Sequence, residues 1–199
     1  TRALTLEAIP YPVSQQNVTC DAIVSMLARL HRFAPDKNWH YHPHRWPDAQ
    51  LALSLHLLAL PEAAARALRR CQRDSDRLFA EAGLISGDSN AGNWGQRENG
   101  EFVLFDWERF STGHPAIDLA PLIKGMGTPE EYQRLAARYC RFNPRSENDL
   151  ARDIALAKAW IVSEVITLLH KRQKADFPRF QHWYRSYLPD WLREVEKMM

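Results

Sequence analysis

The feature that most constrains the fold of this chain is a β-hairpin signal near the middle of the sequence. The pair Asn99-Gly100 lies between two β-like runs, Asn93 to Arg97 and Phe102 to Phe105. Asn-Gly in this position is the strongest short-range signal for a two-residue hairpin. The second strand of such a hairpin leads into Asp106, so we expect Asp106 to lie at the same end of the hairpin as Asn93.

A tight loop is predicted directly before the hairpin. Residues Leu84 to Ser86 are predicted to form a short strand, and Asp88 begins the loop that follows it. Gly87 and Gly92 allow backbone conformations that would strain other residues. The loop can therefore turn back and place Asn93 beside Asp88, which gathers three polar side chains at one end of the hairpin.

These three side chains match the needs of phosphoryl transfer from ATP. One carboxylate accepts or orients the proton of the attacking hydroxyl, while an amide oxygen and a second carboxylate hold the magnesium that bridges the phosphates. We assign the first role to Asp88 and the metal-binding role to Asn93 and Asp106. An isolated Asp and Asn at this spacing usually form only a capped loop. The expected position of Asp106 at the same end of the hairpin is what favours a catalytic role.

At these residues the chain resembles the aminoglycoside phosphotransferase and choline kinase group of small-molecule kinases, which are relatives of the protein kinases. Three ordered motifs carry the resemblance: Ser86-Gly87-Asp88 through Asn93, then Asp106-Trp107-Glu108, then Pro115-Ala116-Ile117-Asp118-Leu119-Ala120. Two upstream segments are more loosely similar to the family. Leu6 to Pro10 resembles its interlobe hinge, and Leu27 to Arg32 resembles the first helix of its C-terminal lobe.

The resemblance implies an α+β, mainly helical fold, the C-terminal lobe of a protein-kinase-like phosphotransferase. It divides the chain into a hinge remnant, 1–10, and a helical lobe, 11–199, that contains the catalytic loop 84–93 and a metal-binding hairpin, 93–108. The hinge residues that would touch the adenine of ATP are Glu7, Ala8 and Ile9.

The N-terminal nucleotide lobe of this family has no counterpart within the 199 residues, which hold no glycine-rich loop and no phosphate-binding strand lysine before the hinge. We therefore expect the chain alone to be inactive, although the activity implied for the whole enzyme uses ATP and Mg²⁺. We also expect self-association through the face that the missing lobe leaves open, where Leu4, Leu6 and Ile9 would be exposed.

The catalytic loop departs from the family pattern at two positions. Ser86 stands where the family usually has His, and Asn90 stands where many members have a second His. We expect different hydrogen bonds to brace the loop. Asp118 begins a predicted helix, which favours a structural role, either capping that helix or supporting the loop.

The phosphate acceptor is a small hydroxylated molecule by resemblance, since family members use aminoglycosides, choline, ethanolamine and thiamine. Glu108 is a candidate acceptor ligand because it lies two residues after Asp106. Trp160 and Glu164, one helical turn apart, could hold a cationic amine between an aromatic face and a carboxylate. In the alternative, Trp160 belongs to the core and Glu164 is a surface charge. The mildly basic chain favours a metabolite such as an amino alcohol over an aminoglycoside.

Composition is that of a compact globular lobe. Hydrophobic residues make up 45% of the chain, and the formal net charge of +2 gives no electrostatic case for binding nucleic acid or an anionic membrane. The three cysteines are scattered, which favours a reduced, cytoplasmic protein. The longest apolar run, Leu51 to Leu60, ends at Pro61 and is too short to span a bilayer.

Apolar periodicity and capping signals predict helices around the hairpin. They are expected at about Asp21 to Phe33, Pro61 to Ala82, Pro115 toward Gly125, from a capping box at Thr128, from Ser146 through Leu168, and from Pro178 to Lys197 with a break at Pro189.

Two classes of function remain open. The first is a small-molecule kinase, supported by the three motifs. The second is a non-catalytic remnant that binds a ligand or partner, supported by the absent nucleotide lobe and by Ser86 in place of His.

Overall fold

The computed structural model describes residues 7–80 and 83–199. Helices make up most of this part of the chain. They are α1 (Asp21–Leu30), α2 (Asp48–Leu58), α3 (Glu62–Asp74), α4 (Asp76–Ala80), α5 (Ala116–Leu119), α6 (Pro129–Cys140), α7 (Glu147–Lys171) and α8 (Phe177–Glu196), with the 3₁₀ turns η1 (Ala91–Asn93) and η2 (Ala120–Leu122).

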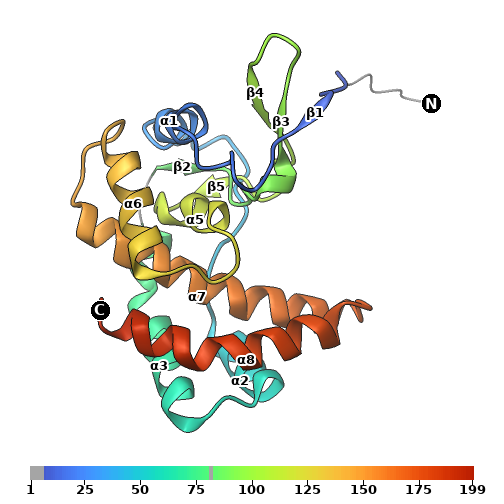
Figure 1. Cartoon of the computed structure of the whole chain (residues 1–199), viewed down its shortest axis with the longest axis vertical. Coiled ribbons are helices and arrows are strands. Elements are labelled where there is room, and N and C mark those ends of the chain that lie inside the picture. Colours follow the sequence, from blue (N-terminus) through green and yellow to red (C-terminus); the bar gives the residue numbers. More distant parts are fainter. Residues whose placement is uncertain (1–6, 81–82) are drawn as a thin grey trace.

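Helix α7 is the centre of the molecule. It contacts α2, α3, α5, α6 and α8, and it separates the two sheets, with α1 and α5, from α2 and α3 (Figure 1). Its buried residues include Leu156, Trp160 and Ile166, and the adjacent face of α8 buries Leu188 and Leu192. Burial of this apolar surface is the main force that holds the helices together, and it forms the base on which the sheets rest.

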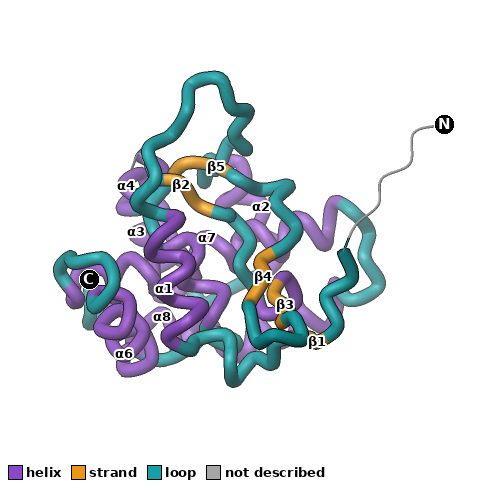
Figure 2. The backbone as a smooth tube through the Cα atoms, turned by 90° about the horizontal axis from the view of Figure 1, so that it is seen from above, coloured by secondary structure: helices purple, strands orange, loops and turns teal. Residues whose placement is uncertain are grey.

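The short strands form two small antiparallel sheets. Their bounds are β1 (Tyr11–Pro12), β2 (Leu84–Ile85), β3 (Trp94–Gln96), β4 (Phe102–Leu104) and β5 (Ser111–Thr112). One sheet has the order β1-β3-β4, and β2 pairs with β5 in the other. Seen from above, both sheets lie near α1, with the loops after β2 and β4 running between them (Figure 2).

The predicted hairpin is present as β3 and β4, with Trp94 opposite Leu104. Its turn differs from the two-residue turn that we predicted. The Arg97 N–H donates to the Glu101 carbonyl at 2.9 Å, so three residues close the turn, and Gly100 has a φ of 85°. A three-residue turn that ends on a left-handed glycine is the next most common hairpin connection.

Three predicted helices are corrected. The helix predicted from Pro61 to Ala82 is interrupted at Ser75, whose Oγ donates to the Gln72 carbonyl at 2.7 Å and competes with the helical pattern. Its last two predicted residues, 81–82, lie outside the described residues. The segment after Pro115 is only α5 followed by η2. The break predicted at Pro189 is absent, because α8 continues through it on buried apolar contacts.

The capping signals are confirmed. Thr128 and Glu131 form the reciprocal capping box that begins α6, and Ser146 accepts the Asp149 N–H at the start of α7. Helix α2 contains most of the apolar run before Pro61, a run that we did not assign to any element from the sequence.

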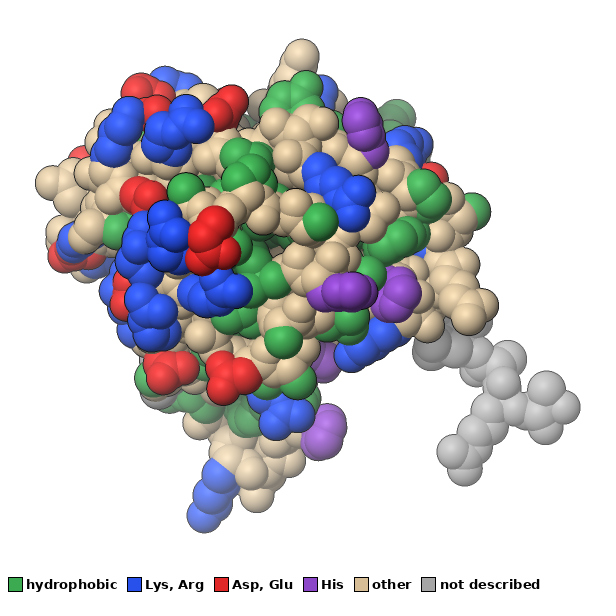
Figure 3. All heavy atoms as spheres, turned by 90° about the horizontal axis from the view of Figure 1, so that it is seen from below, with side chains coloured by type: hydrophobic (Ala, Val, Ile, Leu, Met, Phe, Trp, Pro, Cys, Tyr) green, Lys and Arg blue, Asp and Glu red, His purple; other side chains and the backbone are tan. Residues whose placement is uncertain are grey.

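Charges on the face seen from below are mixed, with basic and acidic side chains side by side and apolar side chains between them (Figure 3). Within residues 7–80 and 83–199, none of the helices combines the length and the apolar character needed to cross a membrane.

Candidate functional site

The loop after β2 turns sharply at Gly87, where φ is 78°. A Cβ atom there would lie 2.2 Å from the Arg109 carbonyl oxygen and 2.6 Å from the His44 ring. Both the left-handed backbone and the close approach exclude other residues. This glycine therefore fixes the path of the chain directly before Asp88.

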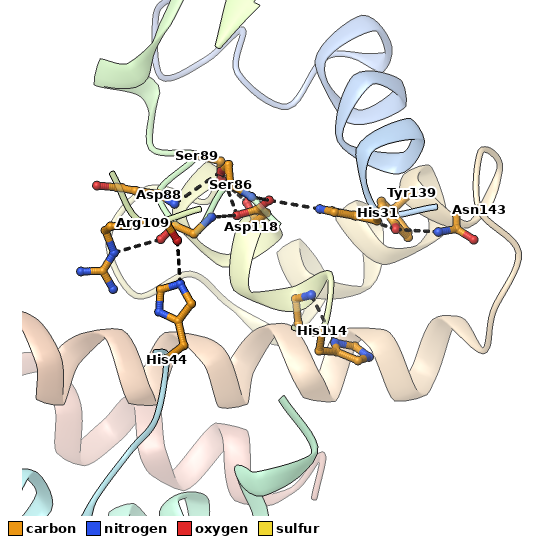
Figure 4. A network of polar contacts seen from close by, with 12 residues as sticks. His31, His44, Ser86, Asp88, Ser89, Arg109, His114, Asp118, Tyr139 and Asn143 are labelled. Atoms are coloured by element: carbon orange, nitrogen blue, oxygen red, sulfur yellow. Dashed lines mark hydrogen bonds and ion pairs between the residues drawn. The ribbon is translucent and has the colours of Figure 1, made fainter. Parts of the chain in front are cut away.

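The buried Asp118 carboxylate stabilises this turn through hydrogen bonds. It accepts the Ser86 and Gly87 backbone N–H groups at 2.7 and 2.8 Å and the Ser86 hydroxyl at 3.0 Å. Asp118 is fully buried, and these donors compensate its desolvated charge. The contacts are those of a residue that supports the loop, and Figure 4 shows them at the centre of a longer network.

That network continues from Asp118 through His31. The His31 Nε2 atom lies 3.1 Å from the Asp118 carboxylate, and its Nδ1 atom lies 2.8 Å from the Tyr139 hydroxyl. Asn143 Nδ2 donates to the same hydroxyl at 2.9 Å. A neutral ring with its proton on Nε2 satisfies these contacts together, with each group donating toward Asp118. Helices α1, α5 and α6 are thereby tied to the loop.

The polar residues of the loop itself contact one another. Asn90 Nδ2 donates to Asp88 Oδ1 at 2.7 Å, and Asn93 Nδ2 donates to the Asp88 carbonyl at 2.8 Å. The Asn90 side chain also caps η1 by accepting the Gly92 N–H at 2.8 Å. Thus both Asn90 and Ser86, for which we expected hydrogen bonds that brace the loop, make such bonds within it.

Asp106 lies at the end of the hairpin next to Asn93. The Phe105 N–H donates to the Asn93 carbonyl at 3.0 Å, which extends the β3 and β4 pairing to the residue before Asp106. Asp106 is exposed and has a φ of 62°, a left-handed conformation that is strained for a residue other than glycine. Strain of this kind is concentrated at functional sites.

Arg109 connects the loop to α7. Its Nε donates to the Gly87 carbonyl at 3.2 Å, and its guanidinium forms an ion pair with Glu164 at 2.6 Å. The His44 ring donates from Nε2 to the Arg109 carbonyl at 2.9 Å. Burial of the ring, together with the nearby Arg109 charge, lowers the pKa of His44 to about 4.

The structure corrects the expected acceptor pair on α7. Trp160 is 1% exposed, packs edge-on against Phe79 and His44, and donates from its indole to the Arg45 carbonyl. It is a core residue. Glu164 is on the same helix, but its carboxylate is already paired with Arg109. The two residues therefore do not present an open aromatic face and a free carboxylate together.

The described part of the predicted hinge runs along the hairpin. Glu7 forms a two-point ion pair with Arg97, at 2.8 and 2.7 Å, and this hydrogen bonding lowers the pKa of Glu7. Ile9 packs over Gly95, and Ala8 between them is exposed. The expectations for Thr1 to Leu6, including exposure of Leu4 and Leu6, lie outside the described residues.

Glu108 lies at a cavity of about 710 Å³. Most of its walls are apolar or aromatic, including Phe33, Trp39, Trp107 and Phe110. None of the described residues that line it belongs to the loop 86–93. It therefore joins a carboxylate to aromatic faces, a combination suited to a cation.

A second cavity, of about 490 Å³, has Asn90 of the loop in its wall. Its other walls come from Gln15, from η2 and the segment after it, and from α7 and α8, and they include Lys158 and Trp183. Lys158 is 5% exposed, and burial lowers its pKa to about 7. We did not identify Lys158 from the sequence, where its only distinguishing signal is a charge inside an apolar stretch of α7.

Among the described residues, no group of three or more histidine, cysteine or acidic side chains is placed to hold a metal. The pair Asn93 and Asp106 is a different kind of donor set, since it joins one amide to one carboxylate. No described hydrogen bond uses Asn93 Oδ1 or the Asp106 carboxylate, so within residues 7–80 and 83–199 both have oxygens free to bind a cation.

Comparison with solved structures supports a kinase-like fold. Choline kinase LicA from Streptococcus pneumoniae is 19% identical with a TM-score of 0.65, and the match covers 94% of this chain and 69% of LicA. An ethanolamine kinase from Plasmodium vivax is 15% identical with a TM-score of 0.61, covering 95% of this chain and 64% of the kinase. A macrolide 2'-phosphotransferase type I is 18% identical with a TM-score of 0.60, covering 90% of this chain and 64% of the enzyme.

The chain thus spans about two thirds of the length of these proteins. Comparison with curated protein sequences gave no match. Residues 6–150, which are more than half of the chain, match the family model described as the phosphotransferase enzyme family. With its kinase-like fold and its three ordered motifs, this chain belongs to the phosphotransferase enzyme family.

Proposed function

We propose that this chain is the catalytic and acceptor-binding lobe of an ATP- and magnesium-dependent phosphotransferase that acts on a hydroxyl group of a small molecule. One observation carries the proposal. The Asn93 side chain bonds to the Asp88 backbone, while its own backbone pairs with Phe105, directly before Asp106. The proposed base and the two proposed metal ligands therefore belong to one hydrogen-bonded unit.

In this proposal Asp88 accepts the proton of the acceptor hydroxyl as the hydroxyl oxygen forms a bond to the γ-phosphorus of ATP. The bond between that phosphorus and the oxygen bridging to the β-phosphate breaks, and ADP leaves with the electron pair. Asn90 orients the carboxylate through its bond to Asp88 Oδ1. Asp118, Ser86 and the His31 network keep the loop in place and do not touch the reactants.

The donor set fits magnesium. Mg²⁺ binds oxygen ligands and is commonly held by one or two protein groups together with substrate phosphates and water. Asn93 Oδ1 and the exposed Asp106 carboxylate would supply the protein ligands. When bound, the metal neutralises the charge that develops on the phosphates during transfer.

Nucleotide binding in this proposal uses the hinge segment at 1–10, including Glu7, Ala8 and Ile9, and a nucleotide lobe in the complete enzyme. Among structures similar to this chain, one is of LicA in complex with AMP and another is of an amicoumacin kinase with AMP-PNP and Ca²⁺. These relatives support ATP and a divalent cation as the co-substrate and cofactor here.

The acceptor class includes the amino alcohols and aminoglycosides expected from the sequence. An aromatic cavity with Glu108 in its wall could bind the cationic part of such a molecule. The cavity beside Asn90 offers the opposite charge, so the charge of the acceptor depends on which cavity receives it.

The proposal is tested with the protein that the complete reading frame encodes. ADP release and phosphorylated product are measured with ATP, with and without Mg²⁺, against a panel of amino alcohols, aminoglycosides and hydroxy acids. Magnesium-dependent product formation supports the proposal. Binding of ligands without any product, under all these conditions, would favour a non-catalytic binding module instead.

A parallel assay uses residues 1–199 alone. Phosphoryl transfer depends on positioning and charge stabilisation of the phosphates, and we expect no turnover above background from this lobe by itself. Robust turnover would contradict the proposed division of labour between the two lobes.

A further inference from the structure

Asn90 links the cavity of about 490 Å³ to Asp88, because it lines the cavity and is hydrogen-bonded to the Asp88 side chain. Asn90 lines the cavity, and its Nδ2 donates to Asp88 Oδ1 at 2.7 Å. The cavity near Glu108 has no described wall residue from the loop 86–93. A molecule in the Asn90 cavity therefore contacts a residue that is hydrogen-bonded to the proposed base.

The charge of this cavity is positive. Lys124, Lys158 and Arg179 are among its lining residues, and none of the described lining residues is acidic. Arg179 is paired with Asp176 at 3.2 Å, outside the cavity wall, while Lys124 is exposed. The cavity therefore favours an anion and disfavours the ammonium group of an amino alcohol.

Lys158 is the central group of this positive wall. Its ammonium is buried and donates one hydrogen bond, to the Ile123 carbonyl at 2.8 Å. An ammonium has three N–H donors, and burying it without a carboxylate partner costs free energy. No described carboxylate lies within ion-pair distance of Lys158. A bound anion would supply the missing acceptor.

Much of the remaining wall is apolar or aromatic. Phe180 and Trp183 from α8 and Ile161 from α7 are among its lining residues. Trp183 is half-buried and also packs against Tyr184. Such walls bind the hydrocarbon or aromatic body of a ligand, while the polar residues fix its two ends.

We propose that the acceptor of this phosphotransferase is a hydroxy acid with an apolar or aromatic body, bound in the Asn90 cavity. Its carboxylate contacts Lys158 with support from Lys124, its body packs against Trp183, and its hydroxyl points toward Asn90 and Asp88. This assignment rests on the proposed function, because it places the acceptor relative to the proposed base.

The test compares three probes of nearly equal shape, each with one hydroxyl: 4-(hydroxymethyl)benzoate, 4-(hydroxymethyl)benzamide and 4-(hydroxymethyl)benzylamine. Two-dimensional NMR titrations of the 199-residue chain at pH 6.5 give each dissociation constant without nucleotide, and shifts at the Trp183 indole locate the site. We expect the benzoate to bind at least ~10-fold more tightly than the benzylamine, about the effect of one charge-assisted hydrogen bond.

Two variants test the residues that carry the charge. Lys158→Met keeps an unbranched side chain of similar length and is expected to abolish the preference for the benzoate. Lys124→Glu changes an exposed position and is expected to weaken benzoate binding without affecting the fold. Lys171→Met is the matched control, since Lys171 is an exposed lysine on the same helix as Lys158 and does not line the cavity.

Equal or tighter binding of the benzylamine would overturn the proposal, as would failure of the benzoate to bind or benzoate binding that neither variant alters. These results are independent of turnover. If the complete enzyme phosphorylates amino alcohols while the benzylamine binds best, the phosphotransferase function stands and the hydroxy-acid assignment fails.

Discussion

Asp118 holds Ser86 through both of its carboxylate oxygens: Oδ2 accepts the Ser86 backbone N–H at 2.7 Å, and Oδ1 accepts the Ser86 hydroxyl at 3.0 Å. Ser86 is one of the two positions at which we expected the loop to be braced by different hydrogen bonds. Its hydroxyl also lies 3.4 Å from the Asp88 N–H, as an acceptor. A short side chain thus links the buried carboxylate to the backbone of the proposed base.

Removing this hydroxyl should lower stability measurably. Ser86→Ala leaves Asp118 with fewer donors, and we expect the free energy of unfolding to fall by about 1–2 kcal/mol. Urea denaturation measures the change. Ser186→Ala is the control, because the Ser186 hydroxyl donates to the His182 carbonyl on the exposed face of α8. Equal effects of the two substitutions would show that Ser86 does not stabilise the loop through its side chain.

Asp118→Asn tests the carboxylate itself. The amide keeps the size but loses the charge and replaces one acceptor with a donor that faces the donors of the loop. We expect a loss of about 3 kcal/mol in the free energy of unfolding, in the range for breaking a buried charged network. Asp190→Asn, at a position whose side chain is 79% exposed, serves as the control and should change stability little. A loss below that of Ser86→Ala would argue against Asp118 as the centre of the network.

His44 should stay neutral in the folded protein down to about pH 4, because burial lowers its pKa to about 4. In the unfolded chain the ring takes up a proton near pH 6.5. Between these values the unfolded state binds more protons, so the contribution of His44 to stability is lost as the pH falls through this window. NMR titration of the ring measures the pKa directly, and a value near 6.5 would contradict the burial argument.

The variant His44→Gln separates this effect from other acidic titrations. Glutamine can still donate to the Arg109 carbonyl but does not titrate. We expect the wild type to lose more stability than His44→Gln between pH 6.5 and pH 4.5. Parallel losses in urea denaturation would mean that protonation of His44 has no part in the acid sensitivity.

Lys158 makes the stability of the protein depend on pH above neutrality, whereas His44 acts in the acidic range. Burial lowers its pKa to about 7, whereas Glu131 acts to raise it, and Lys124 and Arg179 are the other charges at the cavity. Between about pH 7 and pH 10.5 the unfolded chain binds more protons at this position, so the penalty of the buried charge shrinks as the pH rises. The penalty is fully present below pH 7.

We therefore expect Lys158→Met to raise the free energy of unfolding by about 1–4 kcal/mol at pH 6.5. The lost hydrogen bond to the Ile123 carbonyl offsets part of this gain. The gain should shrink by pH 9.5. Urea denaturation of both proteins at the two pH values measures it. A gain that is constant with pH would show that the ammonium is not desolvated in the folded state.

The loop and hairpin could be predicted from the sequence because their signals are local. Asn99-Gly100 marks the turn, and the spacing of Asp88, Asn93 and Asp106 then follows from strand pairing. Even the supporting role of Asp118 agrees with its position at a helix start. The turn length could not be predicted, since Gly100 serves equally well in two- and three-residue connections.

The acceptor cavities could not be predicted, because they depend on how distant helices pack. Helical spacing places Trp160 and Glu164 on one face of α7, but it does not tell which neighbours that face meets. The structure buries Trp160 and pairs Glu164 with Arg109. Lys158 becomes a candidate only when α8 and the segment after η2 close around it.

The most direct test of the account is the turnover of Asp88→Asn in the complete enzyme. Asparagine keeps the size of the side chain but cannot accept a proton. We predict that kcat falls by ~10²–10⁴-fold, the usual contribution of a general base, while thermal stability and nucleotide affinity stay at wild-type values, with Asp190→Asn as the active control. Phosphotransferase activity of Asp88→Asn within a few-fold of the wild type would contradict the assignment of Asp88 as the base.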